Sequence, residues 1–400
     1  MKTAQNTVPE LRFPEFGGRF WEGKRIFSLV EKVSDPVAVD IDRVYREIGI
    51  RSHGKGVFHK EPILGKALGD KRVFWVNPKA FVINIVFAWE QSVALTSEAE
   101  QGFIASHRFL MLLPKNGQTC LEFMLYFFKR KRGKYLLGLA SPGGAGRNKT
   151  LGQNEFLNLT VLFPAVEEQQ KIASFLTSID DKLTKLCRKR ELLNDYKRGL
   201  MQQLFSQTLR FKQDDGSEFA EWESDEFRVI AKRVSESYNS SIETVKYPAI
   251  ELESLDQGSG KILNVFNSLD QKSIKTLFKQ GDVLFGKLRP YLNKFAKPNF
   301  DGVCSSEIWV LRGKKITNDF LFFVVQTSRF QKIVNIQSGS KMPRADWNTV
   351  ADSVFLYPCP TEQQKIADCL SSFDAKIDAV AQQIKQLETF KKGLLQKMFV

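Results

Sequence analysis

Apolar residues recur at alternating steps of four and three along two long stretches of the chain, residues 164–205 and 358–399. In the first stretch these positions hold Leu176, Ile179, Leu183, Leu186, Leu193 and Leu200, and in the second Leu370, Phe373, Ile377, Val380, Ile384, Leu387 and Leu394. A four-three alternation sustained over this length is the period of a coiled-coil seam. The pattern therefore predicts one long helix in each stretch.

The two stretches are copies of each other. They align without a gap at a distance of 194 residues, so that Gln170 matches Gln364 and Gly199 matches Gly393. The residues that lead into each half are repeated as well, with Leu-Arg-Phe at 11–13 and again at 209–211. We therefore interpret the chain as two half-molecules in tandem, each with a lead-in, a globular block and a long helix.

Each seam needs an apolar partner, and the other copy is the nearest candidate. Antiparallel pairing of the two helices would make a spacer of roughly 50–60 Å, at 1.5 Å per residue, with one block at each end. The alternative is that each helix packs on its own block or on a partner protein. The four-three period favours mutual pairing, while Arg190 and Lys197 interrupt the first seam and suggest an additional partner surface.

The blocks between the helices are predicted to mix strands with short helices. Strand-like segments at residues 72–76, 80–87 and 103–113 are separated by turn signals, and residues 121–128 have a helical pattern. The second block repeats this plan, with strands near residues 281–285 and 302–311 and a helix near 320–334.

We expect an α+β fold in which two globular domains are separated by an antiparallel two-helix coiled coil, as a pseudo-twofold tandem repeat. The expected boundaries are a first domain at residues 1–163, a spacer helix at 164–206, a linker at 207–221, a second domain at 222–357 and a second spacer helix at 358–400.

The positive charge of the chain lies in the blocks. The formal net charge is +14. Residues 1–163 carry 24 Lys and Arg against 15 Asp and Glu, and residues 222–357 carry 19 against 15, whereas each repeat helix is within two charges of neutrality. A basic excess of this kind indicates a polyanionic partner such as DNA, contacted by the blocks and not by the helices.

Basic loops with glycine or proline provide the candidate DNA contacts. The sequence predicts Arg147 and Lys149 in the first domain, Lys287, Arg289, Lys341 and Arg344 in the second, and Arg51, His53 and Lys55 on a glycine-rich turn. Arginine and lysine on such loops can bind phosphates or base edges. For any single residue, a solvated loop tip is the alternative interpretation.

The loop at residues 143–150 also resembles a P-loop, GxxxxGK[ST], with Asn148 in place of the last glycine. The residues that follow predict a short helical turn and a strand, whereas a P-loop needs a long helix whose N-terminus faces the phosphates. A DNA-backbone contact fits these residues better, and an ordinary surface turn is a third interpretation.

Other chemistry has little support in the sequence. Five scattered cysteines without CxxC spacing and three histidines without metal-ligand spacing predict free thiols and no metal site. No apolar run approaches the roughly 20 residues of a membrane span, and the N-terminus has no apolar segment typical of a signal peptide. We expect a cytoplasmic protein.

The twin Glu-Gln-Gln-Lys-Ile-Ala helix starts at 168–173 and 362–367, the twin Lys-x-Gly-Leu endings at 197–200 and 391–394, and the segment GDVLFGKLRPYL at 281–292 resemble the specificity (S) subunits of Type I restriction–modification enzymes. The resemblance covers essentially the whole chain. It implies a non-catalytic DNA reader, in which each block recognises one half of a bipartite, asymmetric sequence in double-stranded DNA and the helices set the distance between the half-sites.

The same resemblance implies which partners supply the chemistry. Two methyltransferase (M) subunits would dock on the helices and methylate adenine with S-adenosylmethionine. Restriction (R) subunits would add ATP- and Mg-dependent cleavage, so that no cofactor belongs to this chain. Two alternatives stay open at this point: a P-loop-like nucleotidase with a coiled-coil arm that uses Lys149, and a coiled-coil adaptor without affinity for DNA.

Overall fold

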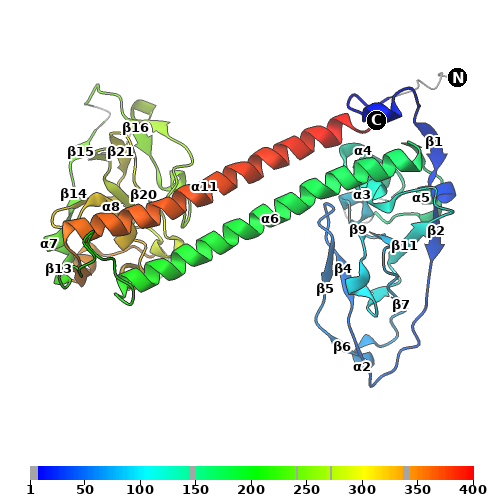
Figure 1. The fold of residues 1–400 in the computed structure, drawn as a ribbon, viewed down its shortest axis with the longest axis horizontal. Coiled ribbons are helices and arrows are strands. Elements are labelled where there is room, and N and C mark those ends of the chain that lie inside the picture. The colour runs from blue at the N-terminus through cyan, green and yellow to red at the C-terminus, as the bar shows by residue number, and fades with distance from the viewer. Residues whose placement is uncertain (1–7, 144–148, 240–241, 271–272, 337–341) are drawn as a thin grey trace. The chain divides into compact units, whose positions relative to one another are not determined.

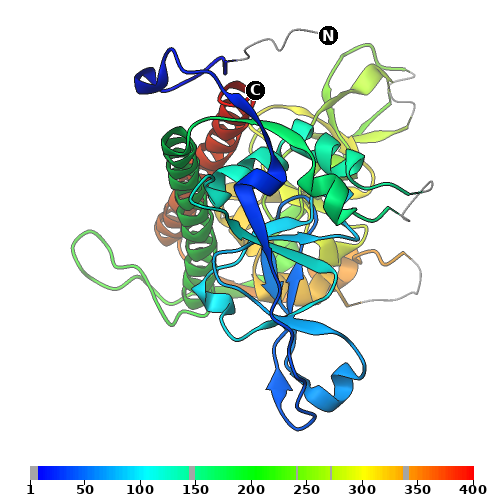
Figure 2. The same cartoon turned by 90° about the vertical axis from the view of Figure 1, so that its right-hand side faces the viewer.

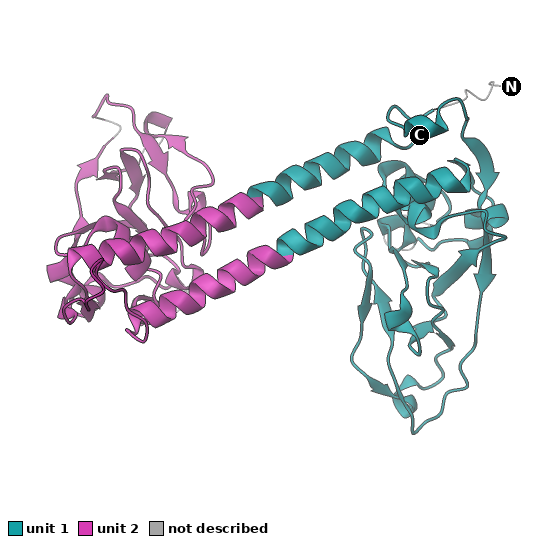
Figure 3. Cartoon of the chain, viewed as in Figure 1, with its two compact units in different colours: residues 1–187, 382–400 teal, residues 188–381 magenta. Residues whose placement is uncertain are grey.

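A computed structural model describes residues 8–143, 149–239, 242–270, 273–336 and 342–400. The chain forms two compact units, which Figure 3 colours separately: residues 1–187 with 382–400 (unit 1) and residues 188–381 (unit 2). Each unit combines a globular block with parts of two long helices, α6 (Val166–Phe205) and α11 (Pro360–Lys397) (Figure 1).

Unit 1 is built around a four-stranded antiparallel sheet. In order across the sheet, the strands are β2 (Val30–Val33), β11 (Phe109–Pro114), β8 (Phe81–Asn84) and β9 (Val93–Leu95). The other strands form antiparallel pairs: β1 (Glu22–Arg25) with β12 (Thr160–Phe163), β7 (Val73–Trp75) with β10 (Ile104–Ser106), β3 (Val44–Tyr45) with β6 (Ile63–Leu64), and β4 (Ile48–Ile50) with β5 (Val57–His59). The α-helices of the block are α1 (Ile26–Leu29), α2 (Gly65–Leu68), α3 (Leu121–Lys129), α4 (Lys131–Leu139) and α5 (Gln153–Leu157), and the 3-10 turns are η1 (Pro14–Phe16), η2 (Ala88–Glu90) and η3 (Glu98–Glu100). In Figures 1 and 2 the segment with β6 and α2 lies at the end of unit 1 away from the long helices.

Both faces of this sheet are buried, which explains its nearly continuous apolar strands. Successive side chains of a strand point to opposite faces. Phe81 and Ile83 therefore join the large core that also contains α3, whereas Val82 packs with Ile50 and Met111 on the other side.

Two strand predictions in this block need correction. The predicted strand at residues 80–87 ends at Asn84, because the Asn84 side-chain oxygen accepts a hydrogen bond from the Val86 amide at 3.1 Å and turns the chain. The predicted strand at 103–113 is two strands in different sheets, β10 and β11. A turn separates them, where the Arg108 amide donates to the Ser106 hydroxyl oxygen.

Unit 2 follows the same plan. Its four-stranded sheet has the order β14 (Ala231–Val234), β22 (Ile308–Gly313), β19 (Val283–Gly286) and β20 (Phe295–Ala296), and β13 (Glu223–Glu226) pairs with β23 (Val354–Tyr357). A five-stranded sheet is added, in the order β15 (Ser237–Tyr238), β18 (Lys275–Phe278), β21 (Gly302–Ser305), β16 (Pro248–Ile250) and β17 (Phe266–Asn267). The α-helices are α7 (Phe227–Ile230), α8 (Asn318–Val324), α9 (Ser328–Val334) and α10 (Trp347–Ala351), and the 3-10 turns are η4 (Leu252–Ser254), η5 (Ser268–Asp270) and η6 (Pro290–Leu292).

The helix predicted near residues 320–334 is two helices, α8 and α9. The chain breaks at Thr327, whose hydroxyl oxygen accepts a hydrogen bond from the Phe330 amide and caps α9. Threonine favours this role over an interior helical position because its side chain can satisfy an amide at the helix start.

Each unit takes the beginning of one long helix and the end of the other into its core. The core of unit 1 contains Leu176 from the start of α6 and Leu394 from the end of α11, whereas that of unit 2 contains Leu204 from the end of α6 and Leu370 from the start of α11. The two helices therefore run antiparallel within each unit. The predicted α+β architecture, with tandem domains and a long spacer helix between them, is confirmed.

The repeated Glu-Gln-Gln segment anchors both helix starts. The Glu168 carboxylate, 1% exposed, accepts hydrogen bonds from the Arg12 Nε and Nη2 atoms at 2.7 and 2.6 Å and from the Trp21 Nε1 atom at 3.3 Å. Glu362 makes the equivalent bonds with Arg210 and Trp222. In each half of the chain, the repeated lead-in therefore binds the repeated helix start through a buried polar contact.

The first glutamine of this segment ties each helix to its block. The Gln169 side-chain oxygen accepts from the Cys120 amide at 3.0 Å, at the start of α3, and the Gln363 oxygen accepts from the Thr317 amide at 2.8 Å, at the start of α8. Both glutamines are fully buried, so the repeated motif has a structural role.

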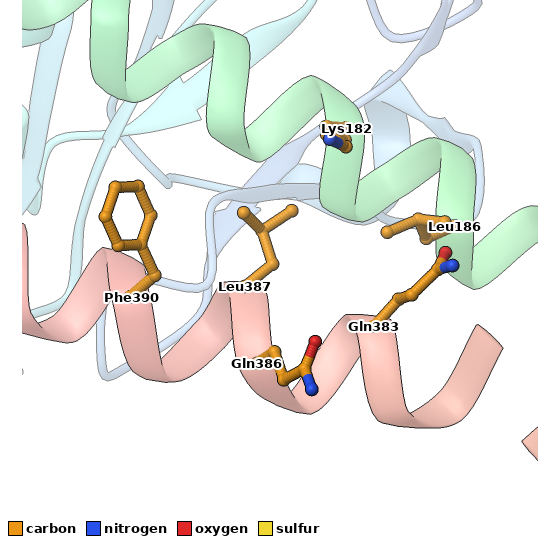
Figure 4. Close-up of a pocket in the computed structure, with 6 residues that line it drawn as sticks. All are labelled: Lys182, Leu186, Gln383, Gln386, Leu387 and Phe390. Atoms are coloured by element: carbon orange, nitrogen blue, oxygen red, sulfur yellow. The ribbon is translucent and has the colours of Figure 1, made fainter. Parts of the chain in front are cut away.

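The predicted seam residues are buried to different degrees. Leu176, Ile179, Leu370, Val380, Ile384 and Leu394 are buried, and Leu183, Leu186, Leu193, Leu200, Phe373, Ile377 and Leu387 are half-buried. In unit 1 the two helices leave a groove of about 420 Å³, lined by Lys182 and Leu186 of α6 and by Gln383, Gln386, Leu387 and Phe390 of α11 (Figure 4). The seam is therefore less tightly closed here than near the helix ends.

Candidate nucleic-acid interface

In unit 2 the structure brings two of the predicted basic loops together. The loop from β19 to β20 runs beside residues 343–345, since the Arg289 amide donates to the Pro343 carbonyl and the Ala345 amide donates to the Lys287 carbonyl, both at 2.8 Å. Lys287, Arg289 and Arg344 are consequently neighbours on one surface, although Arg344 lies 55 residues along the chain from Arg289.

Arg289 is held in a special backbone conformation. Its φ angle is 51°, in the left-handed region that non-glycine residues seldom occupy. The buried Pro290 follows it, and the Leu292 amide donates to the Arg289 carbonyl at 2.9 Å. The rigid turn η6 therefore carries an exposed arginine in a fixed backbone conformation, and strained backbone of this kind is concentrated at functional sites.

Glu307 is the residue of this surface that sequence reasoning missed. Its carboxylate accepts two hydrogen bonds from the exposed Arg344 guanidinium, from Nε and Nη2, each at 3.1 Å. This contact raises the pKa of Arg344 above its usual range. The Glu307 carbonyl also accepts from the Lys287 amide at 2.9 Å. The turn that holds Glu307 is repeated in unit 1, since the Glu307 amide donates to the Ser305 hydroxyl oxygen as the Arg108 amide does to that of Ser106. Glu307 itself carries no signal of DNA binding in the sequence.

Unit 1 has a loop in the equivalent position with different side chains. Phe81 and Val283 begin β8 and β19, Ala88 and Pro290 begin η2 and η6, and Val93 and Phe295 begin β9 and β20, each pair 202 residues apart. By this correspondence, Phe87 occupies the place of Arg289. Phe87 is 41% exposed, so unit 1 presents an aromatic ring where unit 2 presents a guanidinium.

The turn that precedes β11 in unit 1 and β22 in unit 2 also carries different side chains in the two units. The Ile85 amide donates to the Arg108 carbonyl at 2.9 Å, as the Lys287 amide does to the Glu307 carbonyl. The Leu151 amide donates to the Ile85 carbonyl at 2.8 Å, as the Ala345 amide does to the Lys287 carbonyl. Arg108 therefore stands where unit 2 has Glu307, and Lys149 is the first residue of the segment 149–151 that matches residues 343–345.

The predicted turn with Arg51, His53 and Lys55 joins the same surface of unit 1. This turn links β4 to β5, and the amides of His53 and Gly54 donate to the Glu90 and Gln91 carbonyls of the η2 loop at 2.7 and 2.8 Å. All three basic residues are exposed, and the Arg51 guanidinium lies 5.0 Å from the Phe58 ring centroid. Arg147 and Lys341 lie outside the described residues.

The nucleotide-binding interpretation of residues 143–150 does not fit the local fold. Lys149 and Thr150 are followed by α5, which has five residues, and then by the strand β12. A P-loop requires a long helix with its N-terminus on the phosphates. Gly144 to Asn148 lie outside the described residues.

Metal sites and membrane-spanning helices are both absent from the parts of the chain that the structure describes. No group of three or more His, Cys, Asp or Glu side chains is arranged to hold a metal ion there. None of the helices in those same parts is long and apolar enough to cross a membrane.

Comparisons with known proteins agree with this description. The family model of the Type I restriction modification DNA specificity domain matches residues 76–194 and again residues 225–389, one match in each half. The Type I restriction enzyme MjaVIII specificity subunit of Methanocaldococcus jannaschii is 24% identical over 342 residues, which cover 80% of this chain and 80% of that protein. The EcoDI specificity subunit of Escherichia coli is 26% identical over 132 residues, 32% of this chain and 30% of its own length.

Solved structures have the same fold. The Type I restriction-modification S subunit from M. genitalium aligns over 98% of this chain and 99% of its own, with a TM-score of 0.59 and 15% sequence identity. With the family model matched in both halves, the chain belongs to the Type I restriction–modification DNA specificity family and is a specificity subunit, a recognition component and not an enzyme.

Proposed function

We propose that this chain reads a bipartite, asymmetric target in double-stranded DNA, with one half-site for each recognition domain. Residues 1–163 and 222–357 are the two recognition domains. Residues 164–206 and 358–400 are the spacer helices between them, and residues 207–221 are the linker.

The proposal that the two half-sites differ rests on one observation: equivalent positions of the two domains hold side chains of different chemistry. Arg289 corresponds to Phe87, and Glu307 corresponds to Arg108. In the major groove, a guanidinium pairs with the guanine edge, a carboxylate accepts from the cytosine amino group, and an apolar side chain contacts the thymine methyl group. Two domains that present these different groups from one scaffold are suited to two different half-sites.

The remaining basic residues are suited to binding phosphates. Lys287 and Arg344 flank Arg289, and Arg51, His53 and Lys55 lie beside the loop with Phe87. Lys149 follows the glycine-rich loop of the first domain, and we assign Arg147 and Lys341 to the same role on the basis of sequence. Phosphate contacts position a protein on DNA and supply most of its salt-dependent affinity.

The chain acts in a complex, since a recognition subunit without catalytic groups needs partners that modify or cut DNA. We propose that two methyltransferase subunits dock on the spacer helices and that restriction subunits complete the assembly. S-adenosylmethionine, ATP and Mg would then belong to those partners, in the cytoplasm, and this chain would bind no cofactor.

Replacing Arg289 with alanine tests the readout. We expect affinity for the intact target to fall by about 10- to 100-fold, equivalent to about 1–3 kcal/mol, because a bidentate base contact is lost. Discrimination should be lost at one position of one half-site only. Binding of the complex with its methyltransferase partner to a panel of single-base variants of the target measures both quantities.

Arg228→Ala is the matched control, because Arg228 is an exposed arginine of α7 in the same unit, paired with Glu226, and should leave binding unchanged. Uniform weakening on every DNA sequence by Arg289→Ala would assign the residue to a phosphate, and unchanged binding would remove it from the interface.

A further inference from the structure

The two long helices carry a pair of ion pairs related by the internal repeat. In unit 1 the Lys391 ammonium binds the Asp180 carboxylate. In unit 2 the Lys197 ammonium binds both oxygens of Asp374, at 2.6 and 2.8 Å. Asp180 and Asp374 are 194 residues apart, and so are Lys197 and Lys391. Each helix therefore contributes one aspartate and one lysine.

These charges lie at the apolar seam and not on the outer surface. Lys197 and Lys391 occupy seam positions of the four-three pattern, and their side chains are only 14% and 15% exposed. The aspartates are 36% and 35% exposed. Burial raises the pKa of Asp374, with Lys197 acting in the opposite direction. In the sequence, Lys197 interrupts the seam and suggested an additional partner surface. In the structure, its charge is paired with Asp374 within unit 2.

Each pair is also held by a block helix. The Lys391 Nζ atom lies 5.3 Å from the ring centroid of Tyr126 in α3, and the Tyr126 hydroxyl donates to Asp180 at 2.8 Å. In unit 2 the Lys197 Nζ atom lies 5.2 Å from the ring centroid of Phe323 in α8. Cation–π contacts of this kind add to the stability of a lysine in a half-buried position.

A shifted alignment of the helices would break both pairs. The residues one heptad before and after the two aspartates are Ala173, Cys187, Ala367 and Ala381. A slip by one heptad in either direction would therefore place each lysine opposite a residue that cannot accept its charge. Leaving a buried charge without its partner is strongly destabilising, whereas leucines and isoleucines pack against one another in many alignments.

We propose that the Asp180–Lys391 and Lys197–Asp374 pairs fix the register of α6 against α11 and, resting on the function proposed above, fix the gap between the two DNA half-sites. A single polar residue in a coiled-coil seam specifies register at the expense of stability. One heptad corresponds to a shift of about 10 Å along the helix, about three base pairs at 3.4 Å each. The four residues act on specificity through position, without contacting DNA.

The decisive variant replaces all four charges by apolar residues: Asp180→Leu, Lys391→Met, Asp374→Leu and Lys197→Met. We expect its helix content and melting temperature to be retained, because apolar replacements of a whole buried pair are tolerated. The register should become mixed. A second variant exchanges the charges within each pair (Asp180→Lys with Lys391→Asp, and Asp374→Lys with Lys197→Asp), and should keep the single native register. Lys185→Met with Lys385→Met, at exposed helix lysines outside the groove between the helices, is the control for substitution alone.

The register is measured without DNA, by electron paramagnetic resonance distances between spin labels at residues 189 and 361. These are exposed positions of α6 and α11 within unit 2, and they lie about 30 Å apart along the helix axis, so that an axial slip changes their distance almost fully. The full-length chain is used, with its five cysteines replaced. We expect one distance in the parent, the charge-exchanged and the control chains, and in the apolar variant a second population shifted by about 10 Å. A single, unchanged distance in the apolar variant would overturn the proposal, because the block cores would then set the register.

The gap is measured separately, by mapping methylated adenines with the methyltransferase partner present. The apolar variant should modify sites with additional gap lengths, and the charge-exchanged variant only sites with the parental gap. Mixed register with one unchanged gap would overturn the link to DNA spacing. If the parent chain itself directed no sequence-specific methylation, the proposed function would fail, whatever the spin-label distances.

Discussion

Replacing Arg12 with alanine is expected to destabilise unit 1 by about 3–5 kcal/mol, since the substitution leaves the Glu168 carboxylate buried without its guanidinium. Glu168 is 1% exposed and the Arg12 side chain 9% exposed, so neither group can recover full hydration in the folded state. The Trp21 Nε1 atom, at 3.3 Å from the carboxylate, is a neutral donor and cannot replace the lost charge. The lead-in at residues 8–13 should detach from the start of α6.

Hydrogen exchange of the β8 and β11 amides, compared with the β19 and β22 amides, measures the free energy of opening in each unit separately. Unit 2 should be unaffected by Arg12→Ala, and Arg210→Ala should show the reverse pattern because Arg210 binds Glu362. Lys79→Ala is the control in unit 1, since Lys79 and Glu98 form an exposed pair and such pairs contribute about 0–1 kcal/mol. Equal effects of Arg12→Ala and Lys79→Ala would contradict the assignment of a buried anchor.

Phe399→Ala is expected to destabilise unit 1 by a comparable amount, about 3–5 kcal/mol, as large-to-small core substitutions do. The Phe399 ring is 4% exposed, stacks on Phe123 with centroids 5.0 Å apart and meets Trp21 edge-on at 6.2 Å. The Arg130 guanidinium covers it at 4.6 Å from the ring centroid. The core of the first block therefore includes a residue just beyond the end of α11, the helix from the other half of the chain.

Thermal unfolding combined with the same exchange measurement tests this dependence. Phe390→Ala is the matched control, because Phe390 lies on α11 nine residues before Phe399, is 53% exposed and is outside the core. It should change stability by less than about 0.5 kcal/mol. Phe205→Ala is the counterpart in unit 2, where Phe205 stacks on Phe320 with centroids 5.2 Å apart. If Phe399→Ala acted no more strongly than Phe390→Ala, the residues that follow α11 would not be part of the unit 1 core.

The repeat and the four-three pattern allowed the architecture to be predicted from sequence. Both can be recognised along the chain without knowing which residues contact one another in the fold. The four-three pattern predicted the long helices α6 and α11, and the tandem lead-ins indicated the two halves. The sequence also marked Lys197 as an interruption of the seam. It could not show that Asp374, 177 residues away, accepts this lysine, because periodicity defines a face and not the residue opposite to it.

The loops were predicted less completely, because they depend on single side chains and on contacts between segments far apart in the sequence. The apolar content of residues 80–87 suggested one strand, but the side chain of Asn84 ends it. Basic loops were recognised by composition, whereas their grouping depends on backbone hydrogen bonds between distant segments, such as those between residues 287–289 and 343–345. Phe87 and Glu307 carried no compositional signal of DNA binding. Phe87 is identified by the correspondence of η2 with η6, and Glu307 by its backbone hydrogen bond to Lys287 and its ion pair with Arg344.

The central claim is that each unit reads its own half of the target, and exchange of one recognition domain tests it most directly. Residues 222–357 are replaced by the corresponding domain of another specificity subunit, both spacer helices are kept, and the methylated adenines are mapped with the methyltransferase partner present. We predict that one half of the methylated sequence changes while the other half and the gap between them stay as they were. A change in both halves, or in neither, would contradict the account.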